Sequence, residues 1–212
     1  MYSNVISEVI IEVVEQYLDR KRPGLQLIIF FLAEESRPAQ VPYRCLLPSE
    51  LDNLLAPVAL SASHVGWGAI RLEPVWVQTG ESAVFAAALA IRNQTTPAEL
   101  DPDMLVRKLA ASRVMITFFN DVDGTENNER VIAAQYFGTK GFFADYDARL
   151  DEPLTQILST VWQAGFEKLV SGQLDPTALA QAVASADRKE AAPTSRTRGE
   201  MLLTMWKQLL AR

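Results

Sequence analysis

The sequence predicts an α+β fold, in which an antiparallel sheet is flanked by helices and followed by a C-terminal helical extension. Apolar residues recur at a helical period over residues 5–18, 154–169 and 201–210. Short apolar segments bounded by turn-forming residues lie between these helices and are typical of strands. Short connections between such segments favour antiparallel pairing. The expected order is helix, three strands, helix, strands and a long helix.

In the first half of the chain, the helix over Val5–Leu18 ends before Pro23 and Gly24. The segment Leu25–Leu32 is apolar on both faces, which predicts a central strand covered on both sides. Residues 34–43 contain two prolines and predict a loop, and Ser49–Asp52 has a capping pattern that predicts a short helix. Two strands, 69–78 and 83–92, are expected to form a hairpin around Thr79–Ser82.

In the second half, Asp101 and Pro102 form a strong helix start, and this helix is expected to end near Ser112. A long helix opens at Asp151-Glu152-Pro153, and Asp175-Pro176 opens another. Three strands are expected between the first two of these helices: Val114–Phe119, Arg130–Phe137 and Phe142–Ala148.

The expected domain organisation is a core over residues 1–172 and a helical extension over residues 173–212. The chain has 212 residues, which suffices for one sizeable core with an appendage. Residues 187–199 are charged, small and proline-containing, so they predict a linker inside the extension.

Composition excludes several classes of function. Hydrophobic residues make up 49% and charged residues 22%, which is typical of a globular protein. The longest apolar run, Leu27–Ala33, is too short for a membrane span, so no membrane association is expected. The net charge of −6 disfavours nucleic-acid binding. A single cysteine and an N-terminus unlike a signal peptide predict a cytoplasmic protein.

The single Cys45 and single His64 restrict the possible chemistry. A zinc site with several Cys or His ligands cannot be built from one chain, so no metal is expected. Cys45 is interpreted as a small buried apolar residue, and His64 as a solvated loop residue. Gly66-Trp67-Gly68 is an incomplete dinucleotide fingerprint because Arg71 stands in place of the third glycine. No cofactor is therefore expected.

One short motif suggests catalysis. The sequence Asp121-Val-Asp123-Gly-Thr follows an apolar segment and resembles the first motif of haloacid-dehalogenase-type phosphohydrolases. The resemblance implies a magnesium-dependent enzyme with Asp121 as nucleophile and Asp123 as general acid/base. The alternative is a solvated hairpin loop, because Asp-Gly favours a tight turn. The second interpretation is preferred, and no catalytic residue is assigned beyond these two low-ranking candidates.

The C-terminal helix is the strongest functional feature of the sequence. It carries a dense apolar face with Met and Trp, which are favoured anchors in protein interfaces. Either this face docks on its own domain, or it binds another protein or a second copy of the chain. As a candidate protein-binding face it comprises Met201, Leu202, Met205, Trp206, Leu209 and Leu210.

The order of elements resembles that of class I type III secretion chaperones and the related YbjN-like domains. The stretch that carries this resemblance, 105–169, includes Arg113-Val-Met-Ile-Thr-Phe-Phe, an acidic turn, Phe142-Phe-Ala-Asp-Tyr and Asp151-Glu-Pro. The resemblance implies an acidic, non-enzymatic chaperone-like or adaptor protein that binds a partner protein or itself as a homodimer. The alternatives are the magnesium-dependent phosphohydrolase and a structural subunit of a larger assembly.

Overall fold

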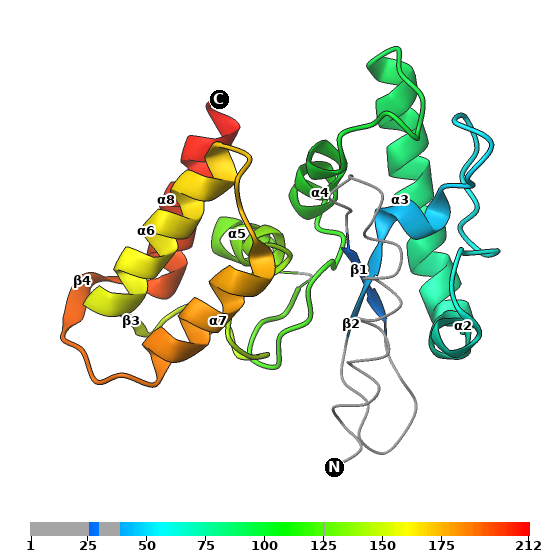
Figure 1. Ribbon diagram of the computed structural model, residues 1–212. Helices are drawn as coiled ribbons and strands as arrows, with labels where there is room; N and C mark the ends of the chain where they lie inside the picture. The colour runs from blue at the N-terminus through cyan, green and yellow to red at the C-terminus, as the bar shows by residue number, and fades with distance from the viewer. Residues whose placement is uncertain (1–25, 30–38, 125) are drawn as a thin grey trace. The chain divides into compact units, whose positions relative to one another are not determined.

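The computed structural model describes residues 26–29, 39–124 and 126–212, and it divides the chain into two compact units, Met1–Leu109 and Ala110–Arg212 (Figure 1). The α+β class with antiparallel strand pairing is confirmed. The helix expected over Val5–Leu18 lies outside the described residues. The boundary between the units falls within the 1–172 segment for which one core was expected, and residues 173–212 belong to the second unit.

The described part of the first unit combines one strand pair with four helical segments. β1 (Gln26–Ile29) pairs antiparallel with β2 (Ala39–Pro42), so that Leu27 lies opposite Val41. The strand expected at 25–32 is present over residues 26–29, where the described residues place it in a two-stranded sheet rather than at the centre of a larger one. The loop expected at 34–43 contains the strand β2. The helical segments are η1 (Tyr43–Leu46), α2 (His64–Ile70), α3 (Glu73–Arg92) and α4 (Pro102–Ala111). Ser49–Asp52 is not helical, so that prediction was wrong.

The hairpin expected over residues 69–92 is wrong, because α3 runs unbroken through its supposed turn. The hydroxyl of Ser82 donates to the carbonyl of Gln78, one helical turn back, at 3.0 Å. The hydroxyl of Thr79 lies 2.7 Å from the carbonyl of Pro57, outside the helix, and 3.0 Å from that of Val75, one turn back. Both hydroxyls therefore find acceptors without breaking the helix, Ser82 within the helix and Thr79 at the loop carbonyl of Pro57 as well. Alanines at 83, 86, 87, 88 and 90 add helix propensity that outweighs the single Gly80.

Burial in η1 suppresses the ionisation of two side chains of the first unit. Tyr43 is 1% exposed, and its hydroxyl donates to the carbonyl of Pro97 at 3.0 Å. Burial raises the pKa of Tyr43 to about 12. Burial also raises the pKa of the Cys45 thiol to about 11, against a smaller opposing effect of the neighbouring Arg44 charge. Cys45 is half-buried rather than fully buried as expected, and its raised pKa leaves little thiolate near neutral pH, which disfavours a reactive thiol.

We expect the protein to lose stability above pH 9, where the unfolded chain begins to release protons that Cys45 and Tyr43 still hold when folded. Stability falls with rising pH because the folded state binds more protons there. By pH 11 the loss should reach about 2–4 kcal/mol. Urea unfolding over a pH series measures it. Tyr43→Phe should flatten the fall between pH 10 and pH 12, and equal slopes in both proteins would contradict this assignment.

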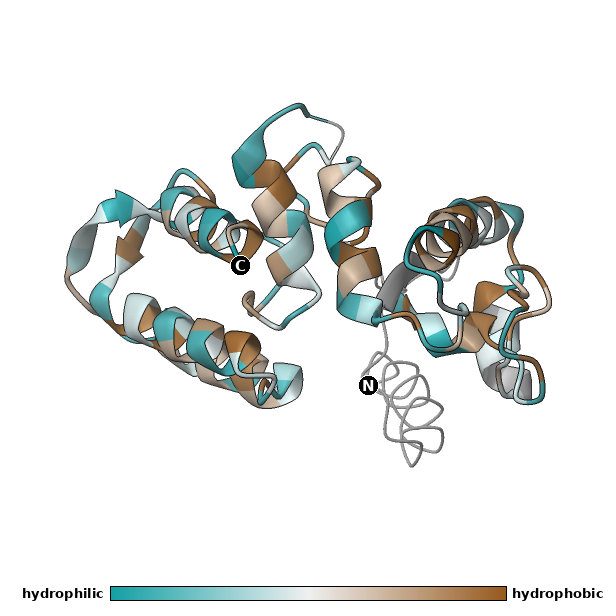
Figure 2. Cartoon of the chain, turned by 90° about the horizontal axis from the view of Figure 1, so that it is seen from above, coloured by the Kyte–Doolittle hydropathy of each residue, from teal (hydrophilic) through white to brown (hydrophobic). Residues whose placement is uncertain are grey.

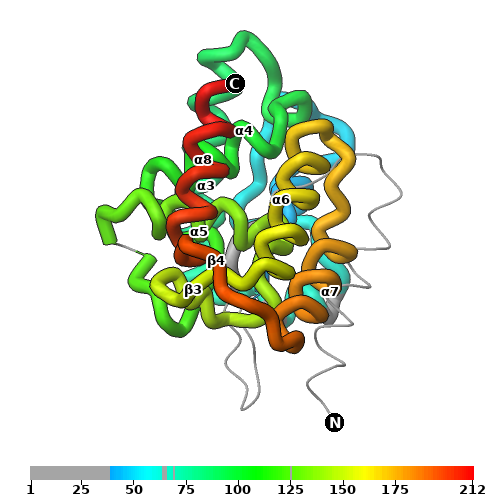
Figure 3. Tube along the Cα trace, turned by 90° about the vertical axis from the view of Figure 1, so that its left-hand side faces the viewer, coloured from blue at the N-terminus to red at the C-terminus, as the bar shows by residue number. Residues whose placement is uncertain are grey.

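The second unit contains four helices and a short strand pair in its described residues. The helices are α5 (Glu129–Gly138), α6 (Gln156–Val170), α7 (Pro176–Asp187) and α8 (Arg198–Leu210). β3 (Pro153–Thr155) pairs antiparallel with β4 (Pro193–Thr197). α6 lies beside α7, and α8 lies beside α5 (Figure 3). The linker expected at 187–199 thus contains a strand, and the helices expected at 154–169, after Asp175 and at 201–210 are present. The expected start of the long helix at Asp151–Pro153 is wrong, because Pro153–Thr155 form β3 and α6 begins at Gln156, capped by Thr155.

The three strands expected between residues 114 and 148 are absent, because side chains replace the hydrogen bonds of a sheet. Gln135, on α5, accepts hydrogen bonds at its Oε1 from the amides of Ile116 and Thr117, at 2.9 and 2.8 Å. Asn128 caps α5 by accepting from the amide of Arg130. Residues 130–137 therefore form a helix, and a side chain of this helix accepts the hydrogen bonds of the 114–119 segment that a neighbouring strand would otherwise accept.

A cluster of aromatic rings forms the centre of the second unit. Trp162 is fully buried and donates from its indole nitrogen to the carbonyl of Phe142 at 2.8 Å. The ring of Phe137 lies 4.8 Å from that of Phe142, and Tyr136 links the cluster to Trp206 at 5.1 Å. Hydrophilic and hydrophobic residues are interspersed along the helices of the chain (Figure 2). None of the described helices is long and apolar enough to cross a membrane.

Candidate functional site

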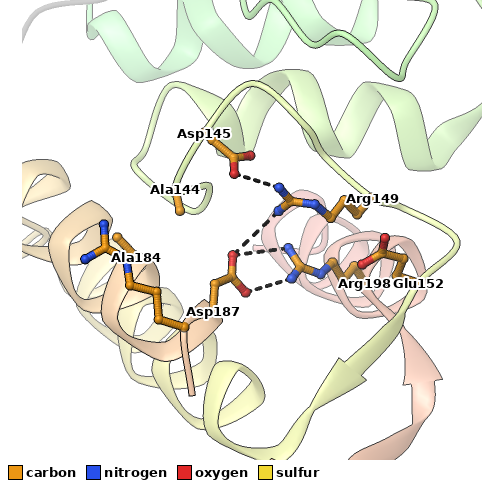
Figure 4. A pocket seen from close by; sticks show the side chains of 8 residues that line it. Ala144, Asp145, Arg149, Glu152, Ala184, Asp187 and Arg198 are labelled. Atoms are coloured by element: carbon orange, nitrogen blue, oxygen red, sulfur yellow. Dashed lines mark hydrogen bonds and ion pairs between the residues drawn. The ribbon is translucent and has the colours of Figure 1, made fainter. Parts of the chain in front are cut away.

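A charged cavity of about 440 Å³ lies in the second unit (Figure 4). It forms where the loop before β3, the end of α7 and the start of α8 meet. The capping box of Thr197 and Glu200 fixes the first turn of α8, and the amide of Arg198 donates to the carbonyl of Glu152 at 3.0 Å. The cavity is lined by Ala144, Asp145, Arg149, Glu152, Ala184, Asp187, Arg188 and Arg198.

Asp187 is the central acceptor of this cavity. Its carboxylate accepts from both terminal nitrogens of Arg198, at 2.7 and 3.5 Å. The guanidinium of Arg149 lies 3.8 Å from the same carboxylate and forms a 2.6 Å ion pair with Asp145 (Figure 4). This chain of ion pairs connects the 145–149 loop, α7 and α8, and so fixes the start of α8.

Arg198 is strongly buried, with 7% of the residue exposed. Its Nε is buried without a hydrogen-bond partner, which is uncommon for a charged group. Three cationic and three anionic side chains line the cavity, so their formal charges cancel. Four of these charged side chains, Asp145, Arg149, Asp187 and Arg198, pair with one another.

Asp145 and Arg149 each stabilise the charged form of the other. Burial raises the pKa of Asp145, but the hydrogen bond from Arg149, the amide of Asp147 and nearby positive charge outweigh it, so the pKa lies below its ordinary value. The hydrogen bond to Asp145 raises the pKa of Arg149, which is already high. Neither group is suited to proton transfer near pH 7, and the contacts of the pair are ion pairs within the chain.

The structure gives Asp121 a structural role. One of its carboxylate oxygens accepts from the amide of Ala148 at 2.8 Å, and the other accepts from the amide of Arg149 at 2.6 Å. Arg149 has a positive φ of 51°, so Asp121 stabilises a conformation that costs energy for a non-glycine residue. Asp123 lies in the same loop, which leads into α5 rather than into a returning strand. No group of three potential metal ligands occurs among the described residues.

The predicted protein-binding face of α8 is covered within its own unit. Met201, Leu202, Met205, Trp206 and Leu209 are buried, and α8 packs on α5 and α6. Leu210 is 57% exposed. Of the two alternatives left open by the sequence, docking on its own unit is the arrangement found here. Binding of this face to a partner stays a prediction, and it would require the contacts with α5 and α6 to open.

Sequence reasoning did not identify the residues of the cavity. Asp187 and Arg198 were both placed in the linker expected at 187–199. The two residues are 11 positions apart and are brought together only by the turn from α7 through β4 to α8. The spacing of Asp145 and Arg149 by four positions was the one local signal of an ion pair. His64, expected in a loop, is the first residue of α2.

A comparison with protein families gives a match for the first unit that differs from the resemblance to type III secretion chaperones. A sequence model of the family FAD dependent oxidoreductase matches residues 28–111, which is less than half of the chain. No curated protein matches the chain, and no solved structure matches it. The match lies almost wholly in the first unit, whereas the charged cavity lies in the second.

This match overturns the resemblance to type III secretion chaperones and YbjN-like domains. The absence of the expected strands among residues 114–148 removes the elements that carried that resemblance. The chaperone-like or adaptor function inferred from it is corrected as well, because the matching family consists of flavin-dependent enzymes. The phosphohydrolase and the assembly subunit gain no support from the match.

The described residues of the first unit do not fit the diphosphate of FAD. A dinucleotide-binding turn places glycines between a strand and a helix N-terminus, so that backbone amides can approach the diphosphate. The matched segment contains only Gly66, Gly68 and Gly80. The first two lie inside α2 and the third inside α3. Two tryptophans of the segment fit the flavin ring better than the glycines fit the diphosphate. The ring of Trp76 lies 6.3 Å from that of Trp67, and the buried indole nitrogen of Trp76 has no hydrogen-bond partner.

Proposed function

We propose that this chain functions in flavin-linked oxidation and reduction, with the first unit as the part related to FAD-dependent oxidoreductases. The observation that carries this proposal is the family match over residues 28–111. It covers β2, η1 and the helices α2, α3 and α4 completely. Bound flavin would supply the redox chemistry, and residues of the chain would hold and orient it.

The described residues support contact with the flavin ring more than contact with its diphosphate. Trp67 and Trp76 are an aromatic pair within the matched segment, and aromatic faces stack readily on planar ring systems. The unpartnered indole nitrogen of Trp76 is a donor that a ring oxygen or nitrogen could satisfy. The fingerprint glycines that would cradle a diphosphate are absent from the matched segment.

We expect the full-length protein to retain flavin after desalting and to show quenched tryptophan fluorescence when flavin binds. Riboflavin and FAD should bind with dissociation constants within about tenfold of each other, because no diphosphate cradle distinguishes them. NAD serves as a control for non-specific binding of a dinucleotide. Loss of both flavins on desalting, without quenching at any flavin concentration, would remove the proposal.

We also propose a cytoplasmic location for the protein. The support is the single Cys45, which cannot form a disulfide within the chain and whose pKa burial raises to about 11. Fractionation of cells expressing the full-length chain tests this location, and recovery of the protein outside the cytoplasmic fraction would contradict it.

A further inference from the structure

The outer face of α3 carries a row of exposed apolar side chains. Val77 is 74% exposed, Val84 is 69% exposed and Ile91 is 79% exposed. They are spaced seven residues apart and therefore lie along one side of the helix over about 21 Å. Single exposed apolar residues are common on protein surfaces, but three large β-branched side chains in one line form a continuous apolar strip, which is typical of an interaction surface. We call Val77, Val84 and Ile91 the α3 row.

Small residues separate the members of the α3 row. A Cβ built on Gly80 would have no atom within 4 Å, so the space above this residue is open. Ala88 is exposed on the same side. Small residues at such positions allow the backbone of a second helix to approach closely, while the larger side chains on either side fill the grooves.

The α3 row has the symmetry of a surface that pairs with itself. Val77 and Ile91 lie seven positions before and after Val84, and Gly80 and Ala88 lie four positions before and after it. In an antiparallel pair of α3 helices related by a two-fold axis at Val84, Val77 would meet Ile91 and Gly80 would meet Ala88. Such a pairing is isologous, which is the commonest arrangement in homodimers.

The charged ends of α3 complement each other in the same arrangement. Glu73 opens the helix and Arg92 closes it, and both are exposed. In the antiparallel pair, Glu73 of one copy lies three positions, or about 4.5 Å, along the axis from the level of Arg92 in the other. An arginine side chain spans this distance, and a parallel pair would instead bring like charges together.

We propose that the chain forms a homodimer through antiparallel pairing of α3, with Val84 on the two-fold axis. The occupant of the α3 row is thus a second copy of this chain. The proposal does not depend on flavin binding, because it rests on the exposure, spacing and charge of α3 alone.

The first test is the mass of the full-length protein in solution over a concentration series. Wild type should be a dimer, and Val84→Glu should weaken the dimer about tenfold or more, because two carboxylates would meet on the axis. Val58→Glu is the matched control, because Val58 is an exposed valine outside α3, and this variant should dimerise as wild type does. A monomeric wild type, or equal dimerisation of both variants, overturns the proposal.

The second test determines the orientation of the two helices. Glu73→Arg and Arg92→Glu should each weaken the dimer, and the double variant should restore it, because the exchanged charges again face each other. Under oxidation, Val84→Cys should give a disulfide-linked dimer. Val77→Cys should cross-link only when mixed with Ile91→Cys. Equal cross-linking of Val77→Cys with itself would show parallel pairing and overturn the antiparallel dimer.

Discussion

Replacing Gly141 by alanine is expected to destabilise the second unit by about 3–5 kcal/mol. Gly141 has a φ of 81°, in the left-handed region that costs about 1–2 kcal/mol for an alanine. A Cβ at this position would also overlap the backbone carbonyl oxygen of Pro176, in the first turn of α7. Backbone atoms cannot turn aside as a flexible side chain can, so either the loop or α7 would have to shift.

Gly172→Ala is the matched control for this substitution. Gly172 also has a positive φ, of 72°, and it also follows the end of a helix. A Cβ built on Gly172 has no atom within 4 Å, so alanine there should cost only about 1–2 kcal/mol. Urea unfolding followed by tryptophan fluorescence gives both values. The difference between the two losses of unfolding free energy measures the overlap with Pro176. Equal losses for the two variants would contradict the close packing of the 139–142 loop on α7.

The sequence predicted best those helices whose beginnings are marked locally. Asp101-Pro102 and Asp175-Pro176 both open helices in the structure, because an aspartate before a proline supplies a cap and a fixed φ. Asp175 accepts hydrogen bonds from the amides of Thr177 and Ala178. These signals act within three or four residues, so the rest of the fold does not alter them.

The predictions failed where distant groups decide the backbone conformation. Nothing near residues 114–119 in the sequence indicates that the amides of Ile116 and Thr117 are satisfied by Gln135. The apolar character of the segment was read correctly, because Ile116 and Phe119 are buried, but its hydrogen bonds go to a side chain instead of a neighbouring strand. The hairpin expected around residues 79–82 failed because turn-forming residues are tolerated in a helix when their hydroxyls find carbonyl acceptors, as Ser82 does one turn back and Thr79 does at Pro57.

The cavity could not be predicted for a related reason. Arg149, Asp187 and Arg198 belong to three different segments, and their ion pairs exist only once α7 and α8 are in place.

The exposure of the side chains along α3 was equally hard to predict. Val77, Val84 and Ile91 would face a core in most amphipathic helices, and only the structure shows that α3 buries the opposite side, with Val75, Ala86 and Leu89.

Trp162 is expected to be the most costly position to truncate among the aromatic residues of the second unit. It is fully buried and belongs to the ring cluster with Phe142 and Phe143, at centroid distances of 6.2 and 6.0 Å. Trp162→Ala removes this packing and leaves a cavity, at a cost of about 3–5 kcal/mol. It also leaves the carbonyl of Phe142 without its indole donor, which adds roughly 1–3 kcal/mol if water cannot enter.

Trp162→Phe separates the two contributions, because it keeps an aromatic ring and removes the indole donor. We expect this variant to lose about 1–3 kcal/mol, well below the loss for alanine. Trp206→Phe serves as a comparison at another buried tryptophan, whose ring lies 5.1 Å from that of Tyr136. Urea unfolding followed by circular dichroism gives the three values. If Trp162→Phe were as damaging as Trp162→Ala, the hydrogen bond to Phe142 rather than ring packing would hold the centre of this unit together, because that bond is the interaction that both variants lose.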